Sequence, residues 1–352
     1  MSGHAVVVGA GVFGASTARA LAGRGWRVTL VEQYSPGDVR TASGGDTRLL
    51  RMGHGDAEWY TTNARDARRL WLELQDETGT RIWEPVGAAW FVQTGGRIAA
   101  DSRLTFERVG IRHEWLAPDD ARHLYPSLRL DDLVGVLFEP DAGVLHARTA
   151  TQLLVEDAER RGVTLETGRA SPEAPPRADV VVWACGAWLP ALFPRELELT
   201  VSRQEVFFFG AGAPWRNTPG FIDPGGGYYG HGNVAGLGVK IASRSPGESV
   251  DPDTLDRVVS RDRQADARAY LAHRFPDLAA APIVGGRVCQ YVLTADTNFV
   301  VARHPERPSW WLVGGGSGHG FKHGPAFGEY VAGCIDGARE PEPFLGLGPR
   351  SG

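Results

Sequence analysis

The sequence predicts an α/β fold, in which a domain with a parallel sheet is interwoven with a second, α+β domain built on an antiparallel or mixed sheet. Strands and helices alternate at the N-terminus, again around residues 143–200, and near the C-terminus, as in parallel sheets. Residues 201–282, in contrast, begin with a strand-rich segment and a hairpin. The chain has 352 residues, enough for two domains, and its 42% hydrophobic and 22% charged residues are typical of globular proteins.

The N-terminal segment carries the most specific local pattern. A β-branched run, His4–Val8, is followed by a turn with glycines at Gly9, Gly11 and Gly14, then by a helix and a second strand that ends at Glu32. The glycines permit a tight turn and a close approach of the backbone to a pyrophosphate, while the carboxylate can accept from a ribose 2′-OH. The pattern favours a Rossmann-type dinucleotide site, with NADP the least expected ligand; a glycine-rich turn in an unrelated α/β fold is the alternative.

The remaining elements follow from periodicity and turn residues. In chain order we expect a helix over 58–76, a strand over 88–92, a short helix over 118–124, a helix over 149–160, strands over 163–166, 180–184 and 201–209, a hairpin at 225–227, a helix over 252–274, two strands within 287–301 joined by a turn at 295–298, a strand over 310–313 and a helix over 325–336. We assign residues 1–85, 143–200 and 283–352 to the cofactor-binding domain, and residues 86–142 and 201–282 to the substrate-binding domain.

Charge and cysteine content exclude several classes of protein. The net charge of −5 argues against a nucleic-acid binder. The three cysteines form no even disulfide framework, which favours a cytoplasmic protein. The longest apolar stretch, residues 180–193, is interrupted by Gly186 and Pro190, so we expect no membrane span, and the N-terminus lacks the basic segment of a signal peptide.

Lysine is nearly absent from this chain. Lys240 and Lys322 are its two lysines, so 35 of the 37 basic residues are arginines. An ammonium group can change its protonation state where a guanidinium cannot. A site that keeps a lysine is therefore a candidate for a role that needs an ammonium group, although each lysine could instead be an ordinary one that reaches solvent.

Four blocks, in this order, resemble the D-amino-acid-oxidase-like flavoprotein family, and most closely its sarcosine oxidase and N-methyltryptophan oxidase branch. They are the glycine turn with Glu32, the run Gly45–Arg51, Lys240 followed by Asp251–Thr254, and Cys289 leading to Gly318–Lys322. The resemblance covers nearly the whole chain. It implies an FAD-binding first domain, oxidation of an amine C–N bond to an imine, and reduction of O2 to hydrogen peroxide.

The resemblance also implies roles for individual residues. Lys240, Arg48 and Lys322 would be catalytic, with Lys240 speeding the reaction with O2, and Cys289 would bond covalently to the flavin. The substrate-binding residues would be Arg51, Lys322, Tyr229, Arg244 and His319. The cofactor-binding residues would be Gly9, Gly11, Gly14, Glu32, Ser43, Thr47, Arg48, Ala170, Gly186, Cys289, Gly318, Gly320, Phe321 and Lys322. No metal site is predicted.

Alternatives stay open for several of these residues. The arginines could pair with surface acids, Cys289 could be a small buried hydrophobe, Tyr229 could pack within its hairpin, and His319 could orient backbone. Arg244 departs from the family pattern, because sarcosine-oxidising members carry a histidine there. The run Ser43–Gly45 lacks the family's adjacent histidines, and residues 168–178 form a short proline-rich bridge.

Four functions are consistent with the sequence. The first is oxidation of a secondary or N-methyl amino acid, by a monomer or small homo-oligomer whose partners are the amine or imino-acid substrate and O2. The second is an oxidase or desaturase of a cyclic imino acid, similar to pipecolate or proline. The third is a flavin-binding protein without turnover, and the fourth and weakest is an NAD dehydrogenase.

Overall fold

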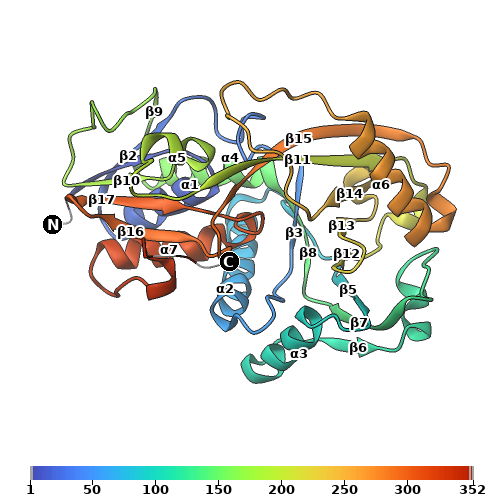
Figure 1. Cartoon of the computed structure of the whole chain (residues 1–352). Coiled ribbons are helices and arrows are strands. Elements are labelled where there is room, and N and C mark those ends of the chain that lie inside the picture. Colours follow the sequence, from blue (N-terminus) through green and yellow to red (C-terminus); the bar gives the residue numbers. More distant parts are fainter. Residues whose placement is uncertain (1–2, 349, 351–352) are drawn as a thin grey trace.

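The computed structural model describes residues 3–348 and 350 (Figure 1). One half of the molecule is built on a six-stranded sheet in which neighbouring strands run parallel, except for an antiparallel edge pair. In spatial order its strands are β16 (Val300–His304), β17 (Arg307–Gly314), β10 (Val180–Trp183), β1 (His4–Val8), β2 (Arg27–Glu32) and β9 (Thr164–Thr167). The buried valines of β1 and β10 are typical of a parallel sheet covered on both faces.

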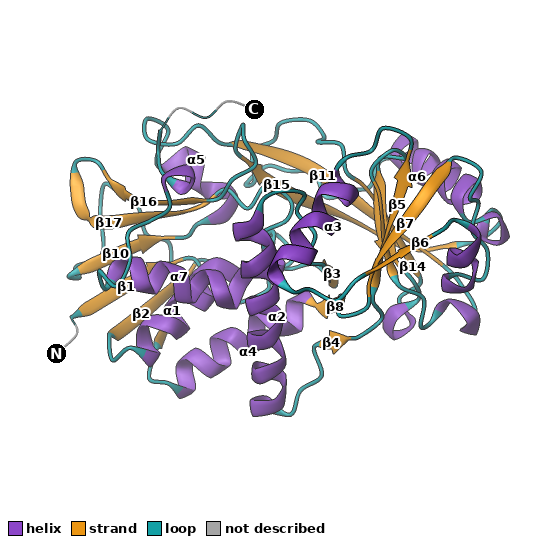
Figure 2. Cartoon of the chain, turned by 90° about the horizontal axis from the view of Figure 1, so that it is seen from below, coloured by secondary structure: helices purple, strands orange, loops and turns teal. Residues whose placement is uncertain are grey.

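Four helices gather beside this sheet, as Figure 2 shows. They are α1 (Val12–Gly23), α2 (Glu58–Thr78), α4 (Ala147–Arg160) and α7 (Gly324–Ile335). A Cβ atom added to Gly328 would lie 2.4 Å from the Ser16 backbone, so this glycine lets α7 approach α1 closely. The apolar faces of these helices close the first hydrophobic core.

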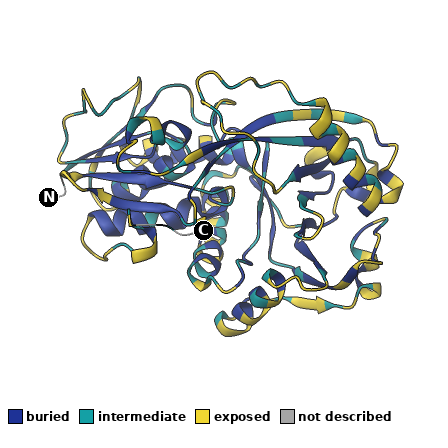
Figure 3. Cartoon of the chain, in the orientation of Figure 1, coloured by how far each residue is buried: buried dark blue, intermediate teal, exposed yellow. Residues whose placement is uncertain are grey.

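The other half is built on an eight-stranded mixed sheet. In spatial order its strands are β15 (Ile283–Leu293), β11 (Thr200–Phe209), β14 (Val239–Ser243), β13 (Tyr228–His231), β12 (Gly220–Asp223), β5 (Ala88–Gln93), β7 (Leu133–Glu139) and β6 (Glu114–Leu116). Helix α6 (Arg261–Arg274) packs on it, and α3 (Ile98–Val109) lies beside β7. The buried residues of Figure 3 follow the strands of both sheets, while the outer faces of α3 and α6 are exposed.

A small three-stranded sheet lies between the two large ones in Figure 1. Its order is β3 (Thr47–Leu50), β8 (Gly143–His146) and β4 (Trp83–Glu84). Strand β3 carries the Thr-Arg-Leu-Leu run of the second sequence block. The small sheet therefore places that block at the junction of the two halves.

The predicted fold class is confirmed, and most predicted elements lie within a few residues of their expected bounds. The helix over 252–274 is wrong in its first part, because α6 begins at Arg261. Ser260 caps this helix by accepting from the Arg263 N–H at 3.3 Å, and Arg203 of β11 instead donates to the carbonyls of Asp256 and Val258. These bonds hold the preceding segment, residues 251–260, in an irregular path of a turn and a bend in place of a helix.

Some elements were not predicted, among them α3, β6 and β7. The two strands within 287–301 exist, but β15 belongs to the eight-stranded sheet and β16 to the six-stranded one. The domain boundaries stay a prediction; β15, which starts at the predicted boundary of residue 283, pairs in the eight-stranded sheet and not in the six-stranded one. None of the helices in the described part of the chain is long and apolar enough to cross a lipid bilayer.

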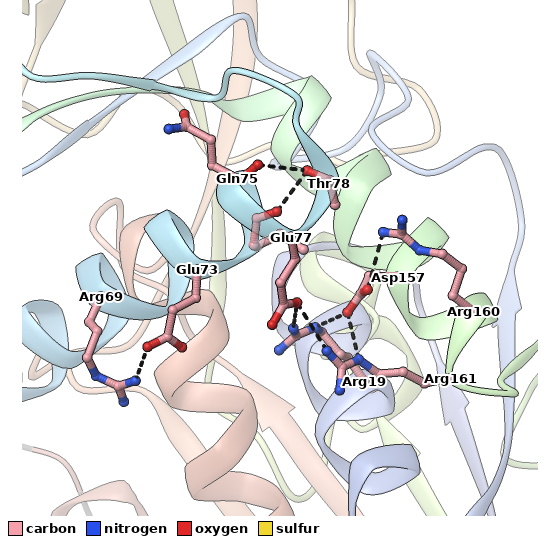
Figure 4. Close-up of polar contacts among 10 residues, drawn as sticks. Arg19, Arg69, Glu73, Gln75, Glu77, Thr78, Asp157, Arg160 and Arg161 are labelled. Atoms are coloured by element: carbon pink, nitrogen blue, oxygen red, sulfur yellow. Dashed lines mark hydrogen bonds and ion pairs between the residues drawn. The ribbon is translucent and has the colours of Figure 1, made fainter.

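An ion-pair cluster joins three helices beside the six-stranded sheet (Figure 4). Asp157 of α4 accepts from Arg19 of α1 at 2.6 Å and from Arg161 at 2.7 Å, and both arginines also contact Glu77 of α2 at 3.3 Å. Burial alone would raise the pKa of Asp157, but the hydrogen bonds from Arg161 and Arg19 outweigh it and lower that pKa. The carboxylate therefore stays charged and holds α1 against α4.

We predict that Asp157→Asn lowers the free energy of unfolding by about 2 kcal/mol, because it leaves two partly buried guanidinium groups with only the more exposed Glu77 as their anion. Urea denaturation measures the change, and Asp66→Asn, which breaks an exposed pair with Arg65 on α2, serves as the matched control with an effect below about 0.5 kcal/mol. Because the pKa of Asp157 is lowered from 3.8, the difference between wild type and Asp157→Asn should shrink as the pH falls below this value. Equal effects of the two variants would contradict the assignment.

Candidate active site

Two adjoining cavities, of about 620 and 500 Å³, lie where the two large sheets meet. Both are lined by Gly11, Ala42, Ser43, Ala184 and Gly186, so together they form one elongated site. The larger cavity is also lined by these predicted residues: Arg48, Arg51, Tyr229, Lys240, Arg244, Cys289, Gly318, His319, Gly320, Phe321 and Lys322. The smaller one adds Gly9, Glu32 and Ala170. The remaining predicted residues, Gly14 and Thr47, lie behind these walls.

The glycine turn contributes Gly11 to the wall shared by the two cavities and Gly9 to the smaller one. Gly9 has φ = 102°, and a Cβ there would lie 2.5 Å from the Ala184 carbonyl oxygen; a Cβ on Gly14 would lie 1.8 Å from the Gly9 oxygen. Larger residues are therefore excluded. Gly11 offers no side chain to cap α1, and the Ser43 Oγ accepts from the Val12 N–H at 2.9 Å.

Glu32 lies at the end of β2, buried in the wall of the smaller cavity. Its carboxylate accepts from the N–H groups of Ala10 at 2.7 Å and Tyr34 at 3.0 Å. These bonds fix the carboxylate at the place where the sequence predicts a ribose. Further along, Asp253 joins the wall and accepts from the Trp188 indole at 2.7 Å and from Arg169 at 3.0 Å, so the 249–253 segment closes the end of the cavity near the proline-rich bridge.

Lys240 of β14 is 3% exposed in the wall of the larger cavity. Its Nζ donates to the Thr47 carbonyl at 3.0 Å and to Thr47 Oγ1 at 3.4 Å, and His231 Nε2 lies 2.7 Å from the same Oγ1. The His231 Nδ1–H donates to the Gly232 carbonyl at 2.8 Å, so its Nε2 accepts from the threonine hydroxyl. Burial, followed by the charge of Arg48, lowers the pKa of Lys240 to about 7.

Arg48 and Cys289 meet at the wall of the same cavity. The Arg48 guanidinium donates to the carbonyls of Thr47 and Ala42 at 2.8 and 2.6 Å, and it lies 3.6 Å from the Cys289 sulfur. Cys289 is 8% exposed on β15. Within the described residues Arg48 forms no ion pair, which rules out the simple pairing with a surface acid.

Arg51, which is half-buried, and Lys322, which is buried, are two further cations of the cavity. Arg51 follows β3, lies 4.6 Å above the Trp90 ring and donates to the Gly53 carbonyl. Lys322 is 3% exposed, and its Nζ donates to the His319 carbonyl at 2.9 Å. Burial lowers the pKa of Arg51 to about 10; burial and the charge of Arg51 place that of Lys322 well below its usual value. Neither has an ion-pair partner among the described residues.

The buried carboxylate of Glu139 holds the backbone that follows Arg51. It accepts from the Trp90 indole and the Met52 N–H, both at 2.6 Å, and from the Gly53 N–H at 3.3 Å. Burial raises its pKa, although these hydrogen bonds oppose the shift. Glu139 thus fixes the backbone that carries Arg51 without pairing directly with the guanidinium.

Sequence reasoning missed several residues of the cavity wall. The hydroxyl groups of Tyr291 and Tyr229 form a hydrogen bond, with 2.7 Å between their oxygens. A Cβ on Gly318 would collide with the Tyr291 ring. Tyr291 stands two positions after Cys289 on one strand, so period-2 alternation could have found it. His54, three positions after Arg51, also lines the cavity and offered no such signal. Arg244 lies exposed at the cavity's edge.

The family assignment rests on the whole sequence together with this geometry. Residues 4–333 match the sequence profile described as FAD dependent oxidoreductase (DAO). The chain belongs to this family. It is therefore an FAD-dependent oxidoreductase, placed among the sarcosine oxidase-like amine oxidases that act on CH–NH donors, and the predicted family resemblance is confirmed.

Individual relatives agree with this placement. The chain is 30% identical to the monomeric sarcosine oxidase of Bacillus sp. (strain NS-129), covering 94% of this chain and 93% of the relative. It is 26% identical to the N-methyl-L-tryptophan oxidase of Salmonella arizonae, covering 98% and 96%. The solved structure of L-proline dehydrogenase from P. horikoshii superposes with a TM-score of 0.83 over 98% of this chain and 97% of that chain, at 20% identity, which shows a shared fold.

The residues of the elongated site fit FAD. Gly9 and Gly14 allow the close backbone contacts that pack the glycine turn beside the cavities, Gly9 and Gly11 line the smaller cavity without side chains, and Gln290 keeps a buried Oε1 without a hydrogen-bond partner in the larger cavity. The two cavities provide room for the two ends of a dinucleotide. The roles of individual residues toward FAD stay predictions.

Proposed function

We propose that this oxidoreductase oxidises the C–N bond of a secondary or N-methyl amino acid to an imine and reduces O2 to hydrogen peroxide. The observation that supports it is the pair of cations Arg51, half-buried, and Lys322, buried, which line one cavity and form no ion pair with a carboxylate among the described residues. A substrate carboxylate would supply the missing anion, with two parallel hydrogen bonds from the guanidinium.

FAD, when bound, accepts two electrons from the amine and passes them to O2. The chain's own residues would bind and orient the substrate. Arg51 and Lys322 would hold the carboxylate, and their charge would lower the pKa of the substrate ammonium, so that the amine binds in its neutral, oxidisable form. The amine loses a hydride equivalent and a proton, which balance the two electrons and two protons that convert O2 to hydrogen peroxide.

A cyclic imino acid is the second candidate substrate. The Tyr229–Tyr291 pair lines the cavity with two aromatic rings, which suit a ring-containing amine. Peroxide release with N-methyl amino acids, proline and pipecolate as substrates separates the two candidates. Absence of flavin reduction by every carboxylated amine under anaerobic conditions would contradict both.

We predict that Arg51→Ala lowers kcat/KM for carboxylated amines about 100-fold or more, because the substrate anion loses its charged hydrogen bonds. Peroxide release measures this, and amines without a carboxylate should be affected far less. Arg97→Ala, which removes an arginine 85% exposed on the surface, is the control and should leave turnover unchanged. Full activity of Arg51→Ala would refute the proposed binding mode.

We propose that Lys240 promotes the reaction with O2, since a fixed cation in a dry site stabilises a developing oxygen anion. Lys240→Met should slow reoxidation of the reduced protein by O2 about 100-fold, as followed by stopped-flow absorbance. The ammonium form exists below the pKa of about 7, so the wild-type reoxidation rate should fall as the pH rises through this value. Anaerobic reduction by substrate is the internal control; an equal loss in both half-reactions would contradict the role.

We propose that Cys289 carries a covalent bond to the flavin, as its place in the cavity wall beside Arg48 supports. Acid precipitation of the wild-type protein should leave the yellow colour in the pellet, and Cys289→Ala should release it to the supernatant. Cys334→Ala, at a buried thiol of α7, is the matched control and should keep the colour in the pellet. A colourless wild-type pellet would show that no tether exists.

A further inference from the structure

Three histidines meet at one end of the larger cavity. His54 follows β3, while His319 and His323 flank Lys322 in the loop and turn before α7. One potential ligand atom from each imidazole lies within 4.8 Å of those of the other two. The ring centroids are 5.2 Å apart for His54 and His319, 5.2 Å for His54 and His323, and 5.9 Å for His319 and His323. His54 and His319 line the cavity, and His323 is fully buried behind them.

Hydrogen bonds fix the orientation of two of these rings. His319 Nε2 lies 3.0 Å from the Thr297 carbonyl, and His323 Nδ1 lies 2.9 Å from Asn63 Oδ1. Both oxygens accept hydrogen bonds, so these nitrogens carry the protons when the rings are neutral. The opposite nitrogens, His319 Nδ1 and His323 Nε2, are then bare lone pairs.

Those lone pairs are buried and without a partner. Along with His54 Nε2, they have no hydrogen-bond partner among the described residues. Buried polar atoms are normally satisfied, and two neighbouring acceptors cannot satisfy each other. What the cluster lacks is a group that accepts electron pairs from several nitrogens at once, which is the chemistry of a metal ion.

The surroundings resemble the outer shell of a histidine metal site. Metal-binding imidazoles typically donate their second N–H to a carbonyl or carboxylate, as His319 and His323 do here. The rings of Tyr60 and Phe299 pack around the cluster. The nearby cations oppose a further positive charge, but Lys322 Nζ is turned to the His319 carbonyl and Arg51 to the Gly53 carbonyl.

We propose that His54, His319 and His323 bind a divalent transition-metal ion, with zinc as the representative of the metals that imidazole prefers. Zinc binds imidazole nitrogen at about 2.0–2.1 Å, which places tetrahedral ligands about 3.4 Å apart, so shifts of about 1 Å in the side chains close the site. Three protein ligands leave a fourth position for water or substrate. This site does not rest on the proposed amine oxidation.

The test uses the full chain with its flavin, freed of metal by a chelator and titrated with zinc chloride by calorimetry. Metal content after gel filtration should be one zinc per chain. His54→Gln and His323→Gln should each weaken zinc binding at least 10-fold, and Asn63→Leu about 10-fold through the lost orientation of His323. His113→Gln changes a histidine outside the cluster and should leave zinc affinity unchanged.

Two results would overturn the site: absence of zinc binding by the wild-type protein, or unchanged affinity in folded His54→Gln and His323→Gln. Flavin absorbance and thermal unfolding report whether the variants fold. X-ray absorption of the zinc-loaded wild type needs no variant; three imidazole nitrogens at about 2.0 Å support the site, whereas sulfur ligands or fewer than three imidazoles overturn it. A normal zinc result alongside failed amine turnover would contradict only the proposed function.

Discussion

Unpaired positive charge buried around one cavity is the constraint on which the site depends. Lys240 and Lys322 are buried and Arg51 is half-buried; all three donate to backbone carbonyls, but no carboxylate among the described residues forms an ion pair with them. Burying charge without a counterion is costly. The two sheets hold the cavity wall in place. An anionic ligand that enters the cavity would pair with these cations and so offset the free-energy cost of burying them. The same cations, shielded from water, therefore serve both ligand binding and the proposed chemistry.

The two sheets meet so that residues far apart in the chain share one wall. Arg48 comes from β3, Lys240 from β14, Cys289 from β15 and Lys322 from the turn before α7. Strand β3 is central to this arrangement, because Thr47 touches Lys240 through its backbone and hydroxyl while its neighbour Arg48 contacts Cys289. A change at the β3 backbone would therefore disturb the lysine and the sulfur together.

The parts of the fold that could be predicted are those with local signals. The turn from Gly9 to Gly14 and the helix after it could be predicted because the glycine spacing and the helical periodicity lie in one continuous stretch of sequence. The irregular path before α6 could not be predicted, since it depends on Arg203, some fifty residues earlier in the chain. The predicted cavity residues lie in four sequence blocks whose order resembles that of the family. His54 lies outside these blocks and is a candidate ligand only because the fold brings it beside His319 and His323, more than 260 residues away. No local pattern contains that information.

The connection between β15 and β16 joins the two halves of the molecule through six residues, 294 to 299. Thr297 within it has a left-handed φ of 61°, and Asp296 is held by Arg350 at 3.0 Å. Because Asp296, Thr297 and Asn298 also line the larger cavity, any hinge motion that opened one sheet from the other would reshape the entrance to the cavity. A label attached to this short linker would consequently report domain opening and ligand entry with the same signal.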